Sequence, residues 1–127
     1  MSHVGIVLIS HSSKVVEGIK DIIRQVVHDV PVEVAGGTDD NDIGTSVEKV
    51  QGAIERAYSE KGVLLFFDLG SARMNAEVAI ELSEYDNIKI ADVPLLEGSY
   101  VGAVESGMGK SLEEVLESAK SVLNPNH

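Results

Sequence analysis

Cysteine is absent from the 127 residues of this chain, and long apolar runs are absent as well. Without cysteine the chain has no disulfide framework, thiolate nucleophile or zinc ribbon. The longest apolar stretches, such as Val63–Phe67, are far shorter than the roughly 18 residues that span a bilayer. The first residues carry no basic region of the kind that opens a signal peptide. We therefore expect a cytoplasmic protein with no membrane partner.

Basic residues are scarce. Lys and Arg number 10 against 21 Asp and Glu, so the net charge is −11, and the excess of acid is spread along the chain. Contacts from basic residues to phosphates dominate nucleic-acid affinity, so the sequence predicts no nucleic-acid partner. An anionic membrane surface would repel the chain for the same reason. The acidic balance is consistent with solubility alone or with a steered encounter with a basic protein.

Four short apolar runs, rich in β-branched residues, predict strands over residues 4–9, 32–35, 63–67 and 88–91. Helical patterns follow them. The second predicted helix begins at Thr45, which has capping-box spacing to Glu48, and the last begins at Ser111, with the same spacing to Glu114. Another helix starts at Pro94 and runs to about residue 106. The first helix is expected to bury one apolar stripe and the third, over residues 74–83, a shorter one: Val15, Val16, Ile19, Ile22, Ile23, Val26 and Val27, and then Val78, Ala79 and Leu82.

Strands and helices alternate in this prediction, which is typical of an α/β fold. We expect one domain over residues 1–127: a doubly wound, mainly parallel sheet of four or five strands with helices on both faces. Such sheets bind ligands at the carboxyl ends of their strands, where the strand order reverses. The site should therefore lie in the loops 10–13, 36–44 and 68–73.

His11 lies two residues beyond the first predicted strand, and Asp68 directly follows the third. If these two strands are neighbours, their ends lie about 4.8 Å apart and the side chains can touch. A carboxylate that accepts from one ring nitrogen fixes the tautomer and leaves the other nitrogen as a nucleophile or base. The competing interpretations are a surface turn residue for His11 and a turn former or helix cap for Asp68.

Small residues and hydroxyls surround this pair at predicted helix starts. Gly70-Ser71 and Gly44-Thr45 supply hydroxyls and backbone N–H groups that hold anions without a formal positive charge. A histidine, a carboxylate and several helix starts together favour phosphoryl transfer through a phosphohistidine. No second histidine falls in these loops, so the sequence predicts no metal site there.

Four segments carry a resemblance to a known family: Val7-Leu8-Ile9-Ser10-His11-Ser12, Gly36-Gly37-Thr38, Ile43-Gly44-Thr45-Ser46, and Phe67-Asp68-Leu69-Gly70-Ser71-Ala72 with Met74-Asn75. In this order they resemble the phosphoryl-donor subunits, DhaM, of phosphotransferase-system-dependent dihydroxyacetone kinases. That family is similar to the mannose-class enzyme IIA domains, which share its fold. The serine after His11, where mannose-class proteins are expected to have glycine, favours the dihydroxyacetone branch.

The resemblance implies a sequence of transfers. His11, supported by Asp68, would accept a phosphoryl group from the phosphocarrier HPr and pass it to ADP held in the subunit DhaL. The ATP so formed would phosphorylate dihydroxyacetone bound in the subunit DhaK. The resemblance implies a homodimer and no tightly bound cofactor on this chain. It also implies phosphate-site roles for residues on the matching loops: Ser12, Gly44, Thr45 and Ser71.

Two other functions stay open at this point. A mannose-class sugar enzyme IIA would hand its phosphoryl group to a IIB protein. A non-catalytic regulatory module with a flavodoxin-like fold would bind an anion in the same crevice and form no covalent phosphate. The sequence also leaves open which ring nitrogen reacts and how the Gly-, Ala- and Ser-rich segment 93–108 packs.

Overall fold

Strands and helices alternate along the chain in the computed structural model, which describes residues 2–123. Within these residues one sheet holds four parallel strands in the order β2-β1-β3-β4. The strands are β1 (Gly5–Ser10), β2 (Val32–Gly36), β3 (Val63–Phe67) and β4 (Ile88–Ala91). The helices are α1 (Ser13–Arg24), α2 (Val47–Ala57), α3 (Gly70–Leu82), α4 (Leu95–Gly107) and α5 (Leu112–Lys120), and a short 3₁₀ turn covers Ser121–Leu123.

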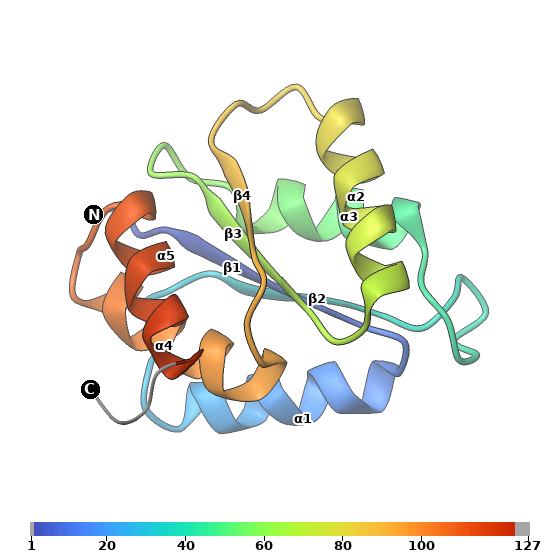
Figure 1. The fold of residues 1–127 in the computed structure, drawn as a ribbon, viewed down its shortest axis with the longest axis horizontal. Helices are drawn as coiled ribbons and strands as arrows, with labels where there is room; N and C mark the ends of the chain where they lie inside the picture. Colours follow the sequence, from blue (N-terminus) through green and yellow to red (C-terminus); the bar gives the residue numbers. More distant parts are fainter. Residues whose placement is uncertain (1, 124–127) are drawn as a thin grey trace.

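The helices cover both faces of the sheet, as Figure 1 shows: α1, α4 and α5 lie on one side, and α2 and α3 lie on the other. Alternate side chains of β1 point to opposite faces of the sheet and pack beneath the helices there. Ile6 and Leu8 pack in the core beneath α1, α4 and α5, and Val7 and Ile9 pack in the core beneath α2 and α3. The predicted doubly wound α/β fold is therefore confirmed, with four strands in the described residues.

The apolar stripe of α1 is narrower than the sequence predicted. Val16, Ile19 and Ile23 of α1 are buried, and so is Val27, although the helix ends at Arg24, before Val26 and Val27. The prediction that the other three members of the stripe are buried is wrong. A helix that packs on a flat sheet buries only the side chains of one face, so neighbouring positions at the edge of the stripe stay in solvent. The half-exposed members are Val15, Ile22 and Val26.

The starts of two helices also differ from the prediction. The N-cap of α2 is Ser46, whose hydroxyl accepts from the N–H of Lys49, and Thr45 lies before the cap. Helix α3 begins at Gly70, four residues before the predicted start. Its buried side chains are alanines, which give a weak hydrophobic signal, so the expectation that Val78 and Leu82 are buried is wrong. Ala72, Ala76 and Ala79 form the buried face, and only the last was predicted.

The segment 93–108 forms α4, with Pro94 in the N-cap position. Small residues line its buried face, and they let the helix approach the sheet closely. A Cβ atom on Gly102 would lie 2.8 Å from Cζ of Phe66, so glycine is required for this approach. The small residues of α4 therefore pack inside the molecule.

The predicted capping box of α5 is confirmed, because Ser111 and Glu114 bond to each other's backbone N–H groups.

Candidate functional site

The site lies where the strand order reverses, at the carboxyl ends of β1 and β3. These strands pair in parallel, with Ile9 opposite Phe67. The residues that follow them, His11 and Asp68, therefore come from neighbouring strand ends, as the sequence predicted.

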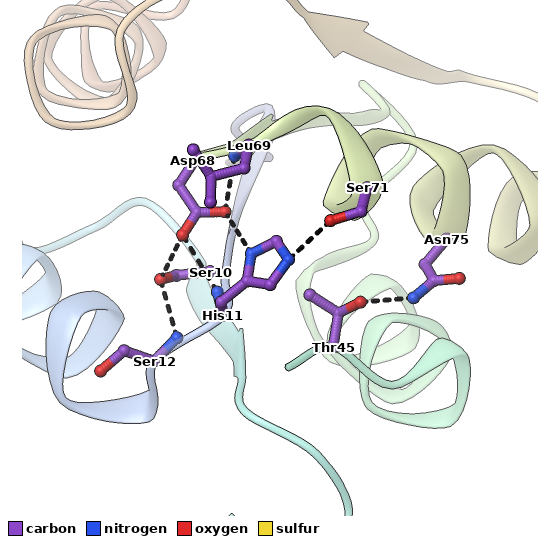
Figure 2. Close-up of polar contacts among 8 residues, drawn as sticks. All are labelled: Ser10, His11, Ser12, Thr45, Asp68, Leu69, Ser71 and Asn75. Atoms are coloured by element: carbon purple, nitrogen blue, oxygen red, sulfur yellow. Dashed lines mark hydrogen bonds and ion pairs between the residues drawn. The ribbon is translucent and has the colours of Figure 1, made fainter. Parts of the chain in front are cut away.

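The His11 ring lies between two polar partners (Figure 2). Its Nδ1 is 3.0 Å from Oδ1 of Asp68, and its Nε2 is 2.7 Å from Oγ of Ser71. The His11 side chain is 21 % exposed, so the ring is held by the protein while one edge reaches solvent. Both ring nitrogens have a defined neighbour, which fixes the orientation of the ring.

Asp68 accepts four hydrogen bonds. Oδ2 accepts from the Ser10 hydroxyl at 2.8 Å and from the His11 backbone N–H at 3.0 Å. Oδ1 accepts from the Leu69 N–H at 2.7 Å and faces the His11 ring. Burial by itself raises the pKa of Asp68, but these hydrogen bonds together outweigh burial and lower the pKa below its ordinary value. Asp68 is therefore an ionised acceptor at neutral pH.

The ionised carboxylate determines the tautomer of the ring. A carboxylate only accepts, so Nδ1 of His11 must carry the proton that it shares with Asp68. In the neutral ring Nε2 is then the nitrogen with the free lone pair, and the Ser71 hydroxyl donates to it. The arrangement thus presents Nε2 as a nucleophile, next to the first turn of α3.

That first turn has backbone donors without an intrahelical acceptor, as at every helix start. The N-cap residue of α3 is Leu69, and it supplies no side-chain acceptor. Leucine is a poor N-cap, and replacement of a good cap by an apolar residue costs about 1 kcal/mol. The N–H of Ala72 donates to the carbonyl of Leu69 at 2.9 Å, so the N–H groups of Gly70 and Ser71 are the ones left for an anion near Nε2 of His11.

Ser10 is a site residue that the sequence analysis missed. Its side chain is fully buried, its hydroxyl donates to Asp68, and it accepts from the N–H of Ser12 at 3.0 Å. The sequence carried no clear signal for this role, because Ser10 was expected in the loop that follows the first strand. Ser12, which the sequence placed at the site, has its own hydroxyl at the N-cap of α1, where it accepts from the N–H of Val15.

The loop 36–44 closes the other side of the site. Its backbone is tied to β1, because the N–H of Gly44 donates to the carbonyl of His11 at 2.9 Å. Gly44 has a φ of +142° and a Cβ there would lie 2.8 Å from Thr38, so the turn requires glycine. Thr45 accepts from the side-chain amide of Asn75, which joins the segment after this loop to α3 (Figure 2).

No three His, Asp or Glu side chains within residues 2–123 are grouped so that they could hold a metal ion. No helix in the same residues is long and apolar enough to cross a membrane. The polar groups that the contacts above bring together at the site are a histidine, a carboxylate and several hydroxyl and N–H donors.

Comparison with known proteins shows what the whole chain is similar to. The family model EIIA-man, described as "PTS system fructose IIA component", matches residues 5–116. The chain is 42 % identical to a protein of Listeria innocua named PEP-dependent dihydroxyacetone kinase 1, phosphoryl donor subunit DhaM, and the match covers 93 % of this chain and 94 % of that protein. It is 37 % identical to the phosphotransferase subunit DhaM of the PTS-dependent dihydroxyacetone kinase of Lactococcus lactis, over 94 % of this chain and 95 % of the relative.

A solved crystal structure of a protein of unknown function shares the fold with a TM-score of 0.85 and 32 % identity, and the match covers 95 % of each chain. A longer relative, the phosphoryl donor subunit DhaM of Escherichia coli, is 34 % identical, but this chain spans only 27 % of its length. A sigma-54 interaction domain protein from Enterococcus faecalis, at 12 % identity and a TM-score of 0.75, shares the fold alone.

Proposed function

Because this chain belongs to the EIIA-man family and to the DhaM relatives within it, we propose that it is the phosphoryl donor subunit of a PEP-dependent dihydroxyacetone kinase. It accepts a phosphoryl group from phosphorylated HPr on His11. It then transfers that group to ADP bound in the subunit DhaL, which acts together with DhaK. The observation that carries the proposal is the His11 ring, held by Asp68 on one nitrogen and open to solvent beside Ser71 on the other.

The first step follows from the tautomer. The Nε2 lone pair attacks phosphorus, an N–P bond forms at Nε2, and the bond between phosphorus and the donor protein breaks. The His11 ring gains positive charge as the bond forms, and the ionised Asp68 stabilises the Nδ1–H while that charge develops. Ser71 and the first N–H groups of α3 receive the phosphoryl oxygens, which bear the negative charge.

The second step reverses these roles. An oxygen of the β-phosphate of ADP attacks the phosphorus on His11, the N–P bond breaks, and ATP leaves with its subunit. The ring returns to the neutral tautomer with its proton on Nδ1, because Asp68 stays ionised throughout. In this proposal the chain itself contributes a nucleophile and oriented donors to the exchange.

Intact-mass spectrometry after incubation with phosphoenolpyruvate, enzyme I and HPr tests the proposal. We expect the wild-type chain to gain one phosphoryl group and the His11→Gln variant to gain none. The group should be lost in acid and kept in alkali, as a phosphoramidate is. An unmodified wild-type chain, with the same HPr active on a control partner, would overturn the proposal in favour of a non-catalytic anion-binding module.

The choice of acceptor is tested separately. Purified phosphorylated chain is mixed with DhaL that holds ADP, or with a mannose-class IIB protein. If the chain is the dihydroxyacetone kinase subunit, it rapidly transfers its phosphoryl group to ADP on DhaL, and ATP forms. It then transfers none to the IIB protein. The reverse pattern would assign the chain to sugar transport.

A further inference from the structure

The Ser71 hydroxyl lies at a helix start, but it does not cap the helix. At other helix starts a serine hydroxyl accepts from a backbone N–H: Ser12 at α1, Ser46 at α2 and Ser111 at α5. Ser71 is the second residue of α3, and within residues 2–123 its hydroxyl has one hydrogen-bond partner, Nε2 of His11 at 2.7 Å. The Ser71 hydroxyl is therefore paired with a base instead of with the backbone.

Ser71, His11 and Asp68 form a continuous row of hydrogen bonds, which Figure 2 shows. The Ser71 hydroxyl donates to Nε2 of the ring, and the Nδ1–H on the other side of the ring donates to Oδ1 of Asp68 at 3.0 Å. The carboxylate is itself held by the Ser10 hydroxyl and by two backbone N–H groups. A hydroxyl bonded to a base that a third group orients is the geometry of an activated nucleophile.

The first turn of α3 supplies donors for an oxyanion beside this nucleophile. The N–H groups of Gly70 and Ser71 have no acceptor within residues 2–123, whereas that of Ala72 is taken by the carbonyl of Leu69. Backbone N–H groups, the nucleophile's own among them, stabilise the tetrahedral intermediate of acyl transfer in serine hydrolases. The site thus combines a nucleophile, a base, an orienting carboxylate and oxyanion donors.

The surroundings of Ser71 restrict the substrates that fit. The Ser71 residue is exposed, and a Cβ atom on the neighbouring Gly70 would meet nothing within 4 Å, so no side chain walls off the hydroxyl on that side. A site without walls gives a long acyl chain nothing to pack against. The chain carries a net charge of −11, which disfavours anionic esters. A small neutral ester is therefore the class of substrate that the site can take.

We propose that Ser71, His11 and Asp68 of the unphosphorylated chain act as a catalytic triad that hydrolyses small neutral acyl esters. This activity goes beyond the proposed function and shares its histidine: Nε2 of His11 serves here as a base and there as a nucleophile. The sequence contains no Gly-x-Ser-x-Gly motif that would have indicated a hydrolase. Triads are defined by geometry and roles, and they occur on unrelated folds without a shared motif.

The reaction has two steps. In the first, Oγ of Ser71 attacks the carbonyl carbon of the ester while its proton passes to Nε2 of His11. The bond from that carbon to the alcohol oxygen breaks, and the alcohol leaves with the proton from Nε2. In the second step, water attacks the acyl carbon and gives a proton to Nε2, the bond to Oγ breaks, and Nε2 returns the proton to Oγ. The products are the free acid, the alcohol and the original triad.

A fluorophosphonate tests Ser71 as the nucleophile, because an activated serine forms an O–P bond with it and releases fluoride. The full chain is used in its native oligomeric state without any phosphoryl donor, and peptide mass spectrometry locates the label. Ser111 is the internal control, since it is an exposed serine at a helix start that contacts no histidine. We expect Ser71 to react about 100-fold faster than Ser111, within the range for a positioned general base. In His11→Gln, Ser71 should react no faster than Ser111.

Turnover of p-nitrophenyl acetate tests the complete reaction. We expect Ser71→Ala to slow the release of p-nitrophenol about tenfold or more, and Ser111→Ala to leave it unchanged. An imidazole can attack this ester by itself, so a Ser71→Ala variant with the wild-type rate would assign the attack to Nε2 of His11 and overturn the proposal.

Two further results would overturn it: equal labelling of Ser71 and Ser111 by the fluorophosphonate, or release of p-nitrophenol that stops after one equivalent per chain. Neither measurement involves phosphoryl transfer. A chain that HPr does not phosphorylate, but that turns over the ester through Ser71, would therefore refute the proposed function and support the triad.

Discussion

Helices α1 and α3 start at the same edge of the sheet, within reach of His11, yet they are built differently. Helix α1 has a serine N-cap and buries Val16, Ile19 and Ile23 against the sheet. Helix α3 has Leu69 as its N-cap, with no capping side chain, and buries only alanines. Three of its large apolar side chains, Met74, Val78 and Leu82, face solvent, and Ile80 packs partly against the core. The comparison teaches that α1 contributes mainly to the stability of the fold, and α3 mainly to the chemistry of the site.

The largest expected effect is a loss of fold stability, the role that the comparison assigns to α1. Ile23 of α1 is fully buried, so Ile23→Ala removes core volume and leaves a cavity. We expect it to lower the free energy of unfolding by about 2–5 kcal/mol. Leu82→Ala on α3 should change it by less than about 0.5 kcal/mol, because that side chain is exposed. Urea denaturation at unchanged m-value measures both, and equal losses would contradict the assigned division of roles.

The next largest effect is on the rate of phosphoryl transfer at the site beside α3. Asp68→Asn removes the carboxylate charge beside the His11 ring, which in the proposed function stabilises the phosphorylated ring, and it alters the acceptor that fixes the Nδ1 tautomer. We expect transfer from HPr to fall about 100-fold, the range for a group that supports acid–base or nucleophilic catalysis, with little change in secondary structure. Asp92→Asn, at the exposed ion pair with Arg73, is the control and should retain the wild-type rate. Stopped-flow or quenched-flow measurement of the rate at which each variant becomes phosphorylated tests both expectations.

A smaller effect sharpens the contrast between the two N-caps. Leu69→Ser gives α3 the side-chain acceptor that α1 has in Ser12. We expect a gain of about 1 kcal/mol in the free energy of unfolding, together with slower phosphorylation, because the new hydroxyl competes with the phosphoryl oxygens for the same N–H groups. A more stable variant that is phosphorylated at the wild-type rate would show that these donors do not serve the phosphoryl group.

The smallest effect is a pH dependence. The pKa of Asp68 is lower in the folded chain than its ordinary value, so the ionised carboxylate adds stability above the unfolded pKa, near 4. This contribution is lost as the pH falls through the lower folded pKa. The difference in stability between the wild type and Asp68→Asn should therefore shrink as the pH is lowered from about 5 to 2. Acid denaturation of both proteins measures it, and a difference that grows toward low pH would contradict the sign.

The fold was predictable from the sequence because its strands are continuous apolar runs. The pairing of His11 with Asp68 was predictable for a related reason, since each lies within two residues of the end of one of these runs. The start of α3 was not, because Gly70 and a face of alanines give little helical signal. Nor was the role of Ser10, since a serine beside a loop is ordinarily a turn residue. Its buried hydroxyl becomes meaningful only once Asp68 is known to lie 2.8 Å away.

The central claim is that Asp68 holds Nδ1 of His11 and leaves Nε2 as the phosphoryl acceptor. Long-range ¹H–¹⁵N NMR of the phosphorylated chain, labelled with ¹⁵N in histidine, tests it most directly. The account predicts phosphorus coupling to Nε2 of His11, with a retained proton on Nδ1. Coupling to Nδ1, or a phosphoryl group on any other residue, would contradict it.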